Sequence, residues 1–199
     1  MQLVLTTASP TNAVYTDASG APQYKVNTPL KAHNRTTTIS RVVERGIPRR
    51  NSGSSAGGSE SEAEGSARFA NLASIDWRVF ESSVIRFRGQ ELAVHDFFRK
   101  VGWGWYGRHR VFTAPDGREF KWILGAYTSQ LKLNDAAETP VACYRPKKLD
   151  LFSKPRKASL EVLPPFEGML DEIIVTFVYI EHLRKKKERA ARSPTLLNK

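Results

Sequence analysis

Apolar and polar residues alternate in short runs along most of the chain, a period-two pattern typical of strands with one buried face. In residues 74–80, for example, Ile75, Trp77 and Val79 share one side. The expected strands lie at residues 2–7, 13–16, 23–27, 35–44, 72–80, 83–89, 91–95 (a weaker candidate), 108–113, 118–125, 129–135, 139–145 and 157–164. Two of them form the clearest hairpin, joined by Ala114-Pro115-Asp116-Gly117, whose residue types suit a tight turn.

Residues 166–190 break the alternation and predict a helix. Pro164 and Pro165 precede it, acidic residues lie early in it and basic residues late, which suits the helix dipole. Its centre, IIVTFVYI at 173–180, is apolar almost all round and must therefore be buried all round. The β-branched residues in this run leave a strand as the alternative.

About a dozen strands and one helix that needs burial on every side predict a mainly β fold. We expect an antiparallel β-barrel of about twelve strands that encloses the hydrophobic C-terminal α-helix. Phe177 lies at the centre of that helix, so Phe177→Asp is expected to unfold the domain.

One segment lacks any aliphatic or aromatic side chain larger than alanine, namely residues 48–66, PRRNSGSSAGGSESEAEGS. Such a segment cannot bury enough apolar surface to offset its ordering entropy. We therefore expect a single domain over residues 1–190, interrupted by a disordered insertion at 46–68 and followed by a flexible basic tail at 191–199.

Three blocks carry a resemblance: NRTTTISRV at 34–42, PDGREFKWILG at 115–125 and MLDEIIVTFVYIEHLRK at 169–185. They resemble an uncharacterised fungal domain-of-unknown-function family, itself distantly similar to the tubby C-terminal, phospholipid-scramblase and LURP-one-related proteins. That resemblance implies a twelve-stranded barrel around a C-terminal helix. It implies no reaction, and no lipid-binding residue of those proteins can be matched to this chain.

The string GWGWYG at 102–107 satisfies the glycine pattern of dinucleotide-binding turns. That pattern requires a helix directly after the turn, whereas a strand-like run follows here. The favoured interpretation is a glycine turn whose Trp103, Trp105 and Tyr106 cover the end of the barrel. The alternative is an aromatic loop that enters a membrane interface or a ligand pocket.

Metal, cofactor and catalytic motifs are lacking. His33, His95, His109 and His182 are scattered without metal-ligand spacing, and the single cysteine, Cys143, lies in a strand-like run. No hydrolase or phosphate-loop motif occurs. We therefore expect no cofactor, no metal and no enzymatic activity.

The chain of 199 residues carries a formal net charge of +11, which indicates an anionic partner. Its basic residues cluster in two segments, 145–157 and 183–192. The candidate contacts are Arg145, Lys147, Lys148, Lys154, Arg156, Lys157, Arg184, Lys185, Lys186 and Lys187. The expected partner is an anionic membrane surface, a phosphoinositide or an acidic protein, and nucleic acid is a weaker alternative. The remaining alternative is that these basic residues are only solvated and bind no partner.

No window is apolar over the length of a membrane span, the N-terminal residues lack the pattern of a signal peptide, and a single cysteine is typical of a reducing compartment. The expected location is intracellular and cytoplasmic, with peripheral membrane association or a nuclear location as alternatives. Within the insertion, Ser52, Ser59 and Ser61 lie in contexts that kinases prefer and are candidate phosphorylation sites. The leading function is a non-enzymatic binding module for anionic headgroups or an acidic partner. A small-ligand or nucleic-acid binding protein is the alternative, and an enzyme is the third possibility.

Overall fold

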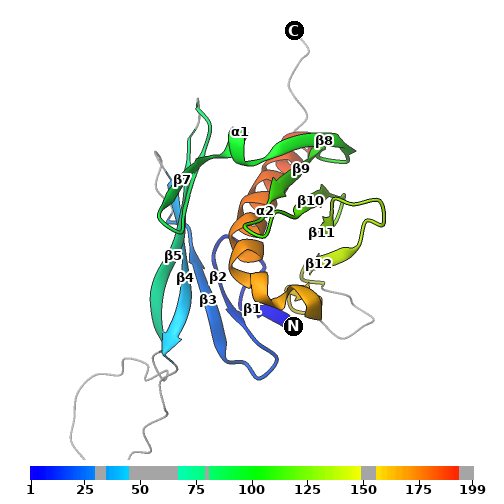
Figure 1. Cartoon of the computed structure of the whole chain (residues 1–199). Coiled ribbons are helices and arrows are strands. Elements are labelled where there is room, and N and C mark those ends of the chain that lie inside the picture. Colours follow the sequence, from blue (N-terminus) through cyan, green and yellow to red (C-terminus); the bar gives the residue numbers. More distant parts are fainter. Residues whose placement is uncertain (30–34, 45–66, 79–80, 149–155, 193–199) are drawn as a thin grey trace, which may run out of the picture.

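In a computed structural model, residues 1–29, 35–44, 67–78, 81–148 and 156–192 are described. Within them, one antiparallel sheet curves around a C-terminal helix, α2 (Figure 1). The strands are β1 (Gln2–Leu5), β2 (Ala13–Thr16), β3 (Pro22–Asn27), β4 (Arg35–Glu44), β5 (Arg68–Trp77), β6 (Val84–Phe87), β7 (Gln90–Ala93), β8 (Arg99–Gly104), β9 (Gly107–Thr113), β10 (Glu119–Leu124), β11 (Ser129–Leu133), β12 (Pro140–Arg145) and β13 (Ser159–Val162). The helices are α1 (Val94–Phe97), the 3-10 helix η1 (Pro164–Met169) and α2 (Leu170–Arg192).

Almost every strand pairs with its neighbours in the sequence. A further pairing joins β1 to β13, where Leu3 lies opposite Leu160. Both halves of the chain therefore belong to one 13-stranded sheet. Its two edges are β7 and β8, and among the described residues no pairing joins them. The expected mainly β class with a C-terminal helix is confirmed, but the strands do not close into a hydrogen-bonded barrel.

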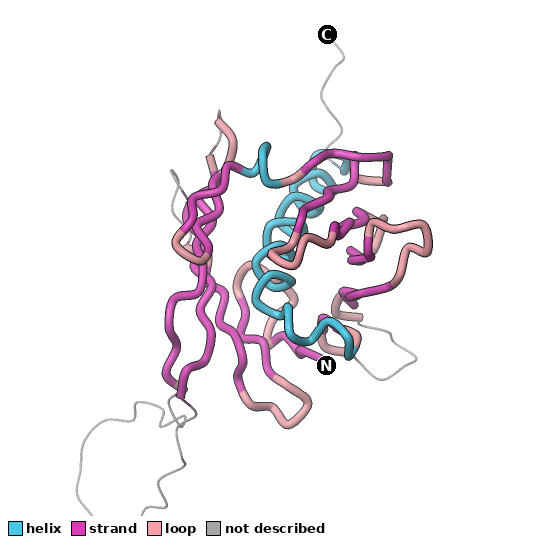
Figure 2. The backbone as a smooth tube through the Cα atoms, viewed as in Figure 1, coloured by secondary structure: helices cyan, strands magenta, loops and turns pink. Residues whose placement is uncertain are grey.

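The helix occupies the space that the curved sheet encloses (Figure 2). Every residue from Glu172 to Glu181 is buried, as an all-round apolar helix requires. Phe177 lies between Trp122 and Tyr144, with ring centroids 5.9 and 5.0 Å away. The helix prediction is therefore confirmed, and the strand alternative for residues 173–180 is wrong.

Several boundaries differ from the expectation. Val94 and His95, expected at the end of a strand, belong to α1, and residues 166–169, expected in the long helix, belong to η1. Residues 99–104, expected as part of a loop, form β8, because their amides and carbonyls pair with β9. Arg68, expected in the insertion, lies in β5, and residues 45–66 are outside the described part of the chain. The helix continues to Arg192, into the expected tail.

Candidate functional site

The string GWGWYG is a β-hairpin, in which Trp105 and Tyr106 form the turn between β8 and β9. Steric contacts explain two of its glycines. A Cβ on Gly104 would lie 2.7 Å from Cε1 of His109 and 2.8 Å from the carbonyl oxygen of Leu124. Gly107 has a φ of +98°, which disfavours any residue with a side chain. The glycines thus serve the packing of a hairpin, and the strand–turn–helix context of a dinucleotide site is not present here.

The two tryptophans of this hairpin point into solvent. The exposed fraction is 81% for Trp103 and 83% for Trp105. The favoured expectation, that these rings cover the end of the barrel, is therefore wrong for both of them. Only Tyr106 packs against the core, as a half-buried side chain.

A third exposed aromatic residue, Tyr127, belongs to the turn between β10 and β11 and has an exposed fraction of 83%. This turn lies beside the hairpin, because Gly104 packs on the carbonyl of Leu124 at the end of β10. It also contacts α2, where Nη1 of Arg184 donates to the carbonyl oxygen of Ala126 at 3.5 Å. Three exposed aromatic rings therefore lie near the end of α2, two on the β8–β9 hairpin and one on the adjacent turn.

The C-terminal end of α2 brings basic side chains to the same place. A Cβ on Gly107 would lie 2.7 Å from Nζ of Lys187, so this lysine lies against the hairpin directly beside its turn. Lys186, Lys187 and Arg189 are exposed, and within the described residues no ion pair joins them to a carboxylate. We call the surface formed by Trp103, Trp105, Tyr127, Lys186 and Lys187 the aromatic–basic end.

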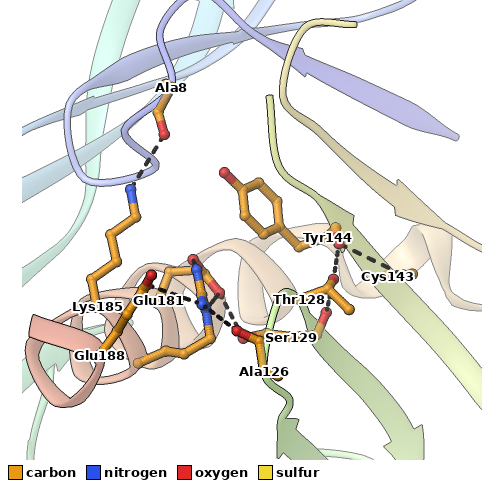
Figure 3. Close-up of polar contacts among 10 residues, drawn as sticks. Ala8, Ala126, Thr128, Ser129, Cys143, Tyr144, Glu181, Lys185 and Glu188 are labelled. Atoms are coloured by element: carbon orange, nitrogen blue, oxygen red, sulfur yellow. Dashed lines mark hydrogen bonds and ion pairs between the residues drawn. The ribbon is translucent and has the colours of Figure 1, made fainter. Parts of the chain in front are cut away.

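Two predicted contact residues of this helix are engaged within the molecule, and Figure 3 shows Lys185 and Glu181. Arg184 is buried with Glu181 and cannot reach an external partner, so its assignment as a contact is wrong. Lys185 is half-buried, and its Nζ donates to the carbonyl oxygen of Ala8 at 3.2 Å. Burial lowers the pKa of Lys185 below its ordinary value.

The other basic segment begins at the end of β12. The hydroxyl of Thr128 donates to the carbonyl oxygen of Tyr144, so this end of β12 borders the turn that carries Tyr127. Arg145 is already paired with Glu161 at 2.9 Å. The remaining predicted residues in the described part are exposed, namely Lys147, Lys148, Arg156 and Lys157. Lys148 and Arg156 pair through their backbones in an isolated β-bridge. Lys154 lies outside the described residues, as do Ser52, Ser59 and Ser61.

The comparisons with known proteins identify a family. The model of a family of unknown function, DUF6593, matches residues 8–186. The chain belongs to DUF6593. No curated protein and no solved structure matches the chain. The DUF6593 match includes the hairpin, Tyr127 and most of α2, and it ends at Lys186, one residue before Lys187.

Two features are absent from the described residues. No group of three or more His, Cys, Asp or Glu side chains among them is placed to hold a metal ion. No helix there is long and apolar enough to cross a membrane.

Sequence reasoning missed Tyr127, because only its position at the tip of a turn beside the hairpin distinguishes it from the other tyrosines.

Proposed function

We propose that this chain is a non-enzymatic binding module that docks on anionic membrane surfaces through its aromatic–basic end. The observation that carries the proposal is the exposure of Trp103 and Trp105, both above 80%, on one hairpin. Large apolar side chains grouped on a surface mark interaction sites more often than single ones do. Tryptophan and tyrosine in particular suit the membrane interface, since an apolar ring is joined to a polar group.

The charge around these rings supports an anionic partner. Lys187 lies beside Gly107 of the hairpin, and Lys186 and Arg189 are exposed on the same last turns of α2. Each basic residue near an anionic leaflet contributes about 1 kcal/mol. The aromatic rings add a contribution that salt does not screen, and their shared position gives the module one membrane-facing end.

The cellular location of the chain is a prediction from its composition. A single cysteine in 199 residues favours a reducing compartment, so we place the module inside the cell, on the cytoplasmic face of membranes. The likeness to fungal sequences and to tubby-like barrels supports the proposal only as a resemblance.

Vesicle flotation tests the proposal. Neutral vesicles are compared with vesicles that contain phosphatidylserine or a phosphoinositide, at about 50 and 300 mM salt, which brackets progressive screening of surface charge. We expect flotation with anionic vesicles only, weakened at high salt. Lys186→Glu with Lys187→Glu, and separately Trp103→Ala with Trp105→Ala, should each reduce it about tenfold or more.

The matched control is Lys25→Glu, which reverses an exposed charge on β3 and should float like the unmodified protein. A parallel titration with a single-stranded oligonucleotide separates membranes from nucleic acid, because exposed rings beside cations also stack on bases. Absence of flotation at low salt, or equal flotation of all variants, would contradict the proposal.

A further inference from the structure

A cavity of about 480 Å³ opens where the sheet does not close. Its walls come from the hairpin of β6 and β7 on one side and from the end of β9 on the other, and α2 forms its floor. The lining residues include Phe87, Arg88, Leu92, Phe112, Thr113 and Glu172. Its volume falls within the range of small-molecule sites, about 300–1,000 Å³.

The walls are mostly apolar. Phe87 and Leu92 are half-buried on one side of the cavity. On the other side, Phe97 stacks on the buried ring of Phe112, with ring centroids 5.7 Å apart. In a closed barrel, a neighbouring strand would cover such side chains. Here β7 is an edge strand, so these surfaces remain accessible to an apolar molecule.

One polar group in the cavity lacks a partner. Glu172, on the first turn of α2, has a side chain that is only 9% exposed. Its Oε1 pairs with Nη2 of Arg88 at 2.5 Å, whereas its Oε2 is buried without any hydrogen bond. A buried carboxylate oxygen without a donor is costly, so a ligand that supplies a donor would recover that cost.

Arg88 holds this arrangement in place at some cost to the backbone. It occupies the turn between β6 and β7 with a φ of +52°, where glycine, asparagine or aspartate is normally preferred. Its guanidinium also lies over the ring of Phe87, 5.1 Å from the ring centroid. Arg88 therefore holds one oxygen of Glu172, a residue that lines the cavity, and the other oxygen has no donor.

We infer that this cavity binds a small apolar molecule that carries a hydrogen-bond donor, an amine or an alcohol, which Oε2 of Glu172 accepts. A carboxylate head is disfavoured, because it offers no donor and would face an acidic side chain. The site is separate from the aromatic–basic end and does not rest on the membrane proposal.

Calorimetric titration with three ten-carbon probes tests the inference at neutral pH: decylamine, 1-decanol and decanoate. The amine and the alcohol should bind, and decanoate should bind about tenfold more weakly or worse, as expected for loss of a hydrogen bond to a charged group. Glu172→Gln should lower the affinity for the amine about tenfold and leave the alcohol nearly unchanged.

Two blocking variants on opposite walls, Leu92→Trp and Thr113→Trp, should each abolish binding of all three probes, with circular dichroism to verify folding. Trp105→Ala is the control and should bind the probes normally, which distinguishes the cavity from the membrane-facing end. The inference is overturned if no probe binds, if decanoate binds as tightly as the amine, or if binding survives both folded blocking variants.

Discussion

Arg184 and Glu181 form an ion pair inside the molecule, with Nε of Arg184 2.8 Å from Oε1 of Glu181 and exposed side-chain fractions of 5% and 0%. Ser129 donates a further hydrogen bond to the same carboxylate at 2.6 Å, which ties α2 to β11 (Figure 3). Removal of the arginine would leave a buried charge without its partner. We expect Arg184→Ala to lower the free energy of unfolding by about 3–5 kcal/mol in urea denaturation.

The matched control is Arg192→Ala on the same helix, since Arg192 pairs with Glu188 but is 77% exposed. That change should cost about 0–1 kcal/mol. Equal effects of the two substitutions would show that the buried pair has no special weight in stability.

Phe177→Asp should prevent folding. Phe177 is fully buried between Trp122 and Tyr144, and a carboxylate there would have neither water nor a basic partner. Phe177→Leu keeps most of the apolar volume and should remain folded. A cooperative thermal transition at the unmodified melting temperature for the aspartate variant would rule out the central position of this helix.

Gly104→Ala should destabilise the hairpin that carries the exposed tryptophans. The added methyl group would lie 2.7 Å from the ring of His109 and 2.8 Å from the backbone oxygen of Leu124, so the hairpin must shift. We expect a loss of about 1–3 kcal/mol by chemical denaturation. Gly168→Ala, at a glycine with open space around it, should change stability by no more than about 0.5 kcal/mol.

Stability should fall as the pH is lowered through the range of His182. Burial, together with Lys186, Arg35 and Arg189, lowers its pKa from 6.5 to about 4 in the folded chain. Below about pH 6.5, His182 therefore binds a proton in the unfolded chain but stays neutral in the folded chain. The free energy of unfolding decreases as the pH falls from there to about pH 4.

The variant His182→Gln checks this contribution in a series of denaturation curves between pH 7 and 4. It loses the ring that stacks on Trp77 at 3.8 Å, so its stability should be lower at neutral pH. Its dependence on pH over this window should nevertheless be flatter than that of the unmodified chain. Parallel curves for the two proteins would exclude His182 as a source of the pH dependence.

Much of the fold could be predicted because alternation and all-round apolarity are local signals. The hairpin around Asp116-Gly117 and the burial of Phe177 follow from residue types at fixed spacing. β8 escaped prediction, because two of its six residues are glycines, which disfavour a strand, and only pairing with β9 makes it one.

The sites were harder to predict, because they depend on contacts between distant segments. Arg184 belongs to a basic run, and only Glu181 and the surrounding sheet turn it into a buried residue. The cavity beside Glu172 exists because β7 and β8 do not pair, which no local pattern reveals.

Fluorescence quenching by brominated acyl chains is the most direct test of membrane docking. Trp122 is fully buried and Trp77 half-buried, so Trp103 and Trp105 should dominate any change on binding. With anionic vesicles at low salt, we predict quenched and blue-shifted emission, and the effect should be absent with neutral vesicles and in the Trp103→Phe, Trp105→Phe double variant. Emission that stays as in buffer on anionic brominated vesicles would contradict the assignment of this end of the molecule to the membrane.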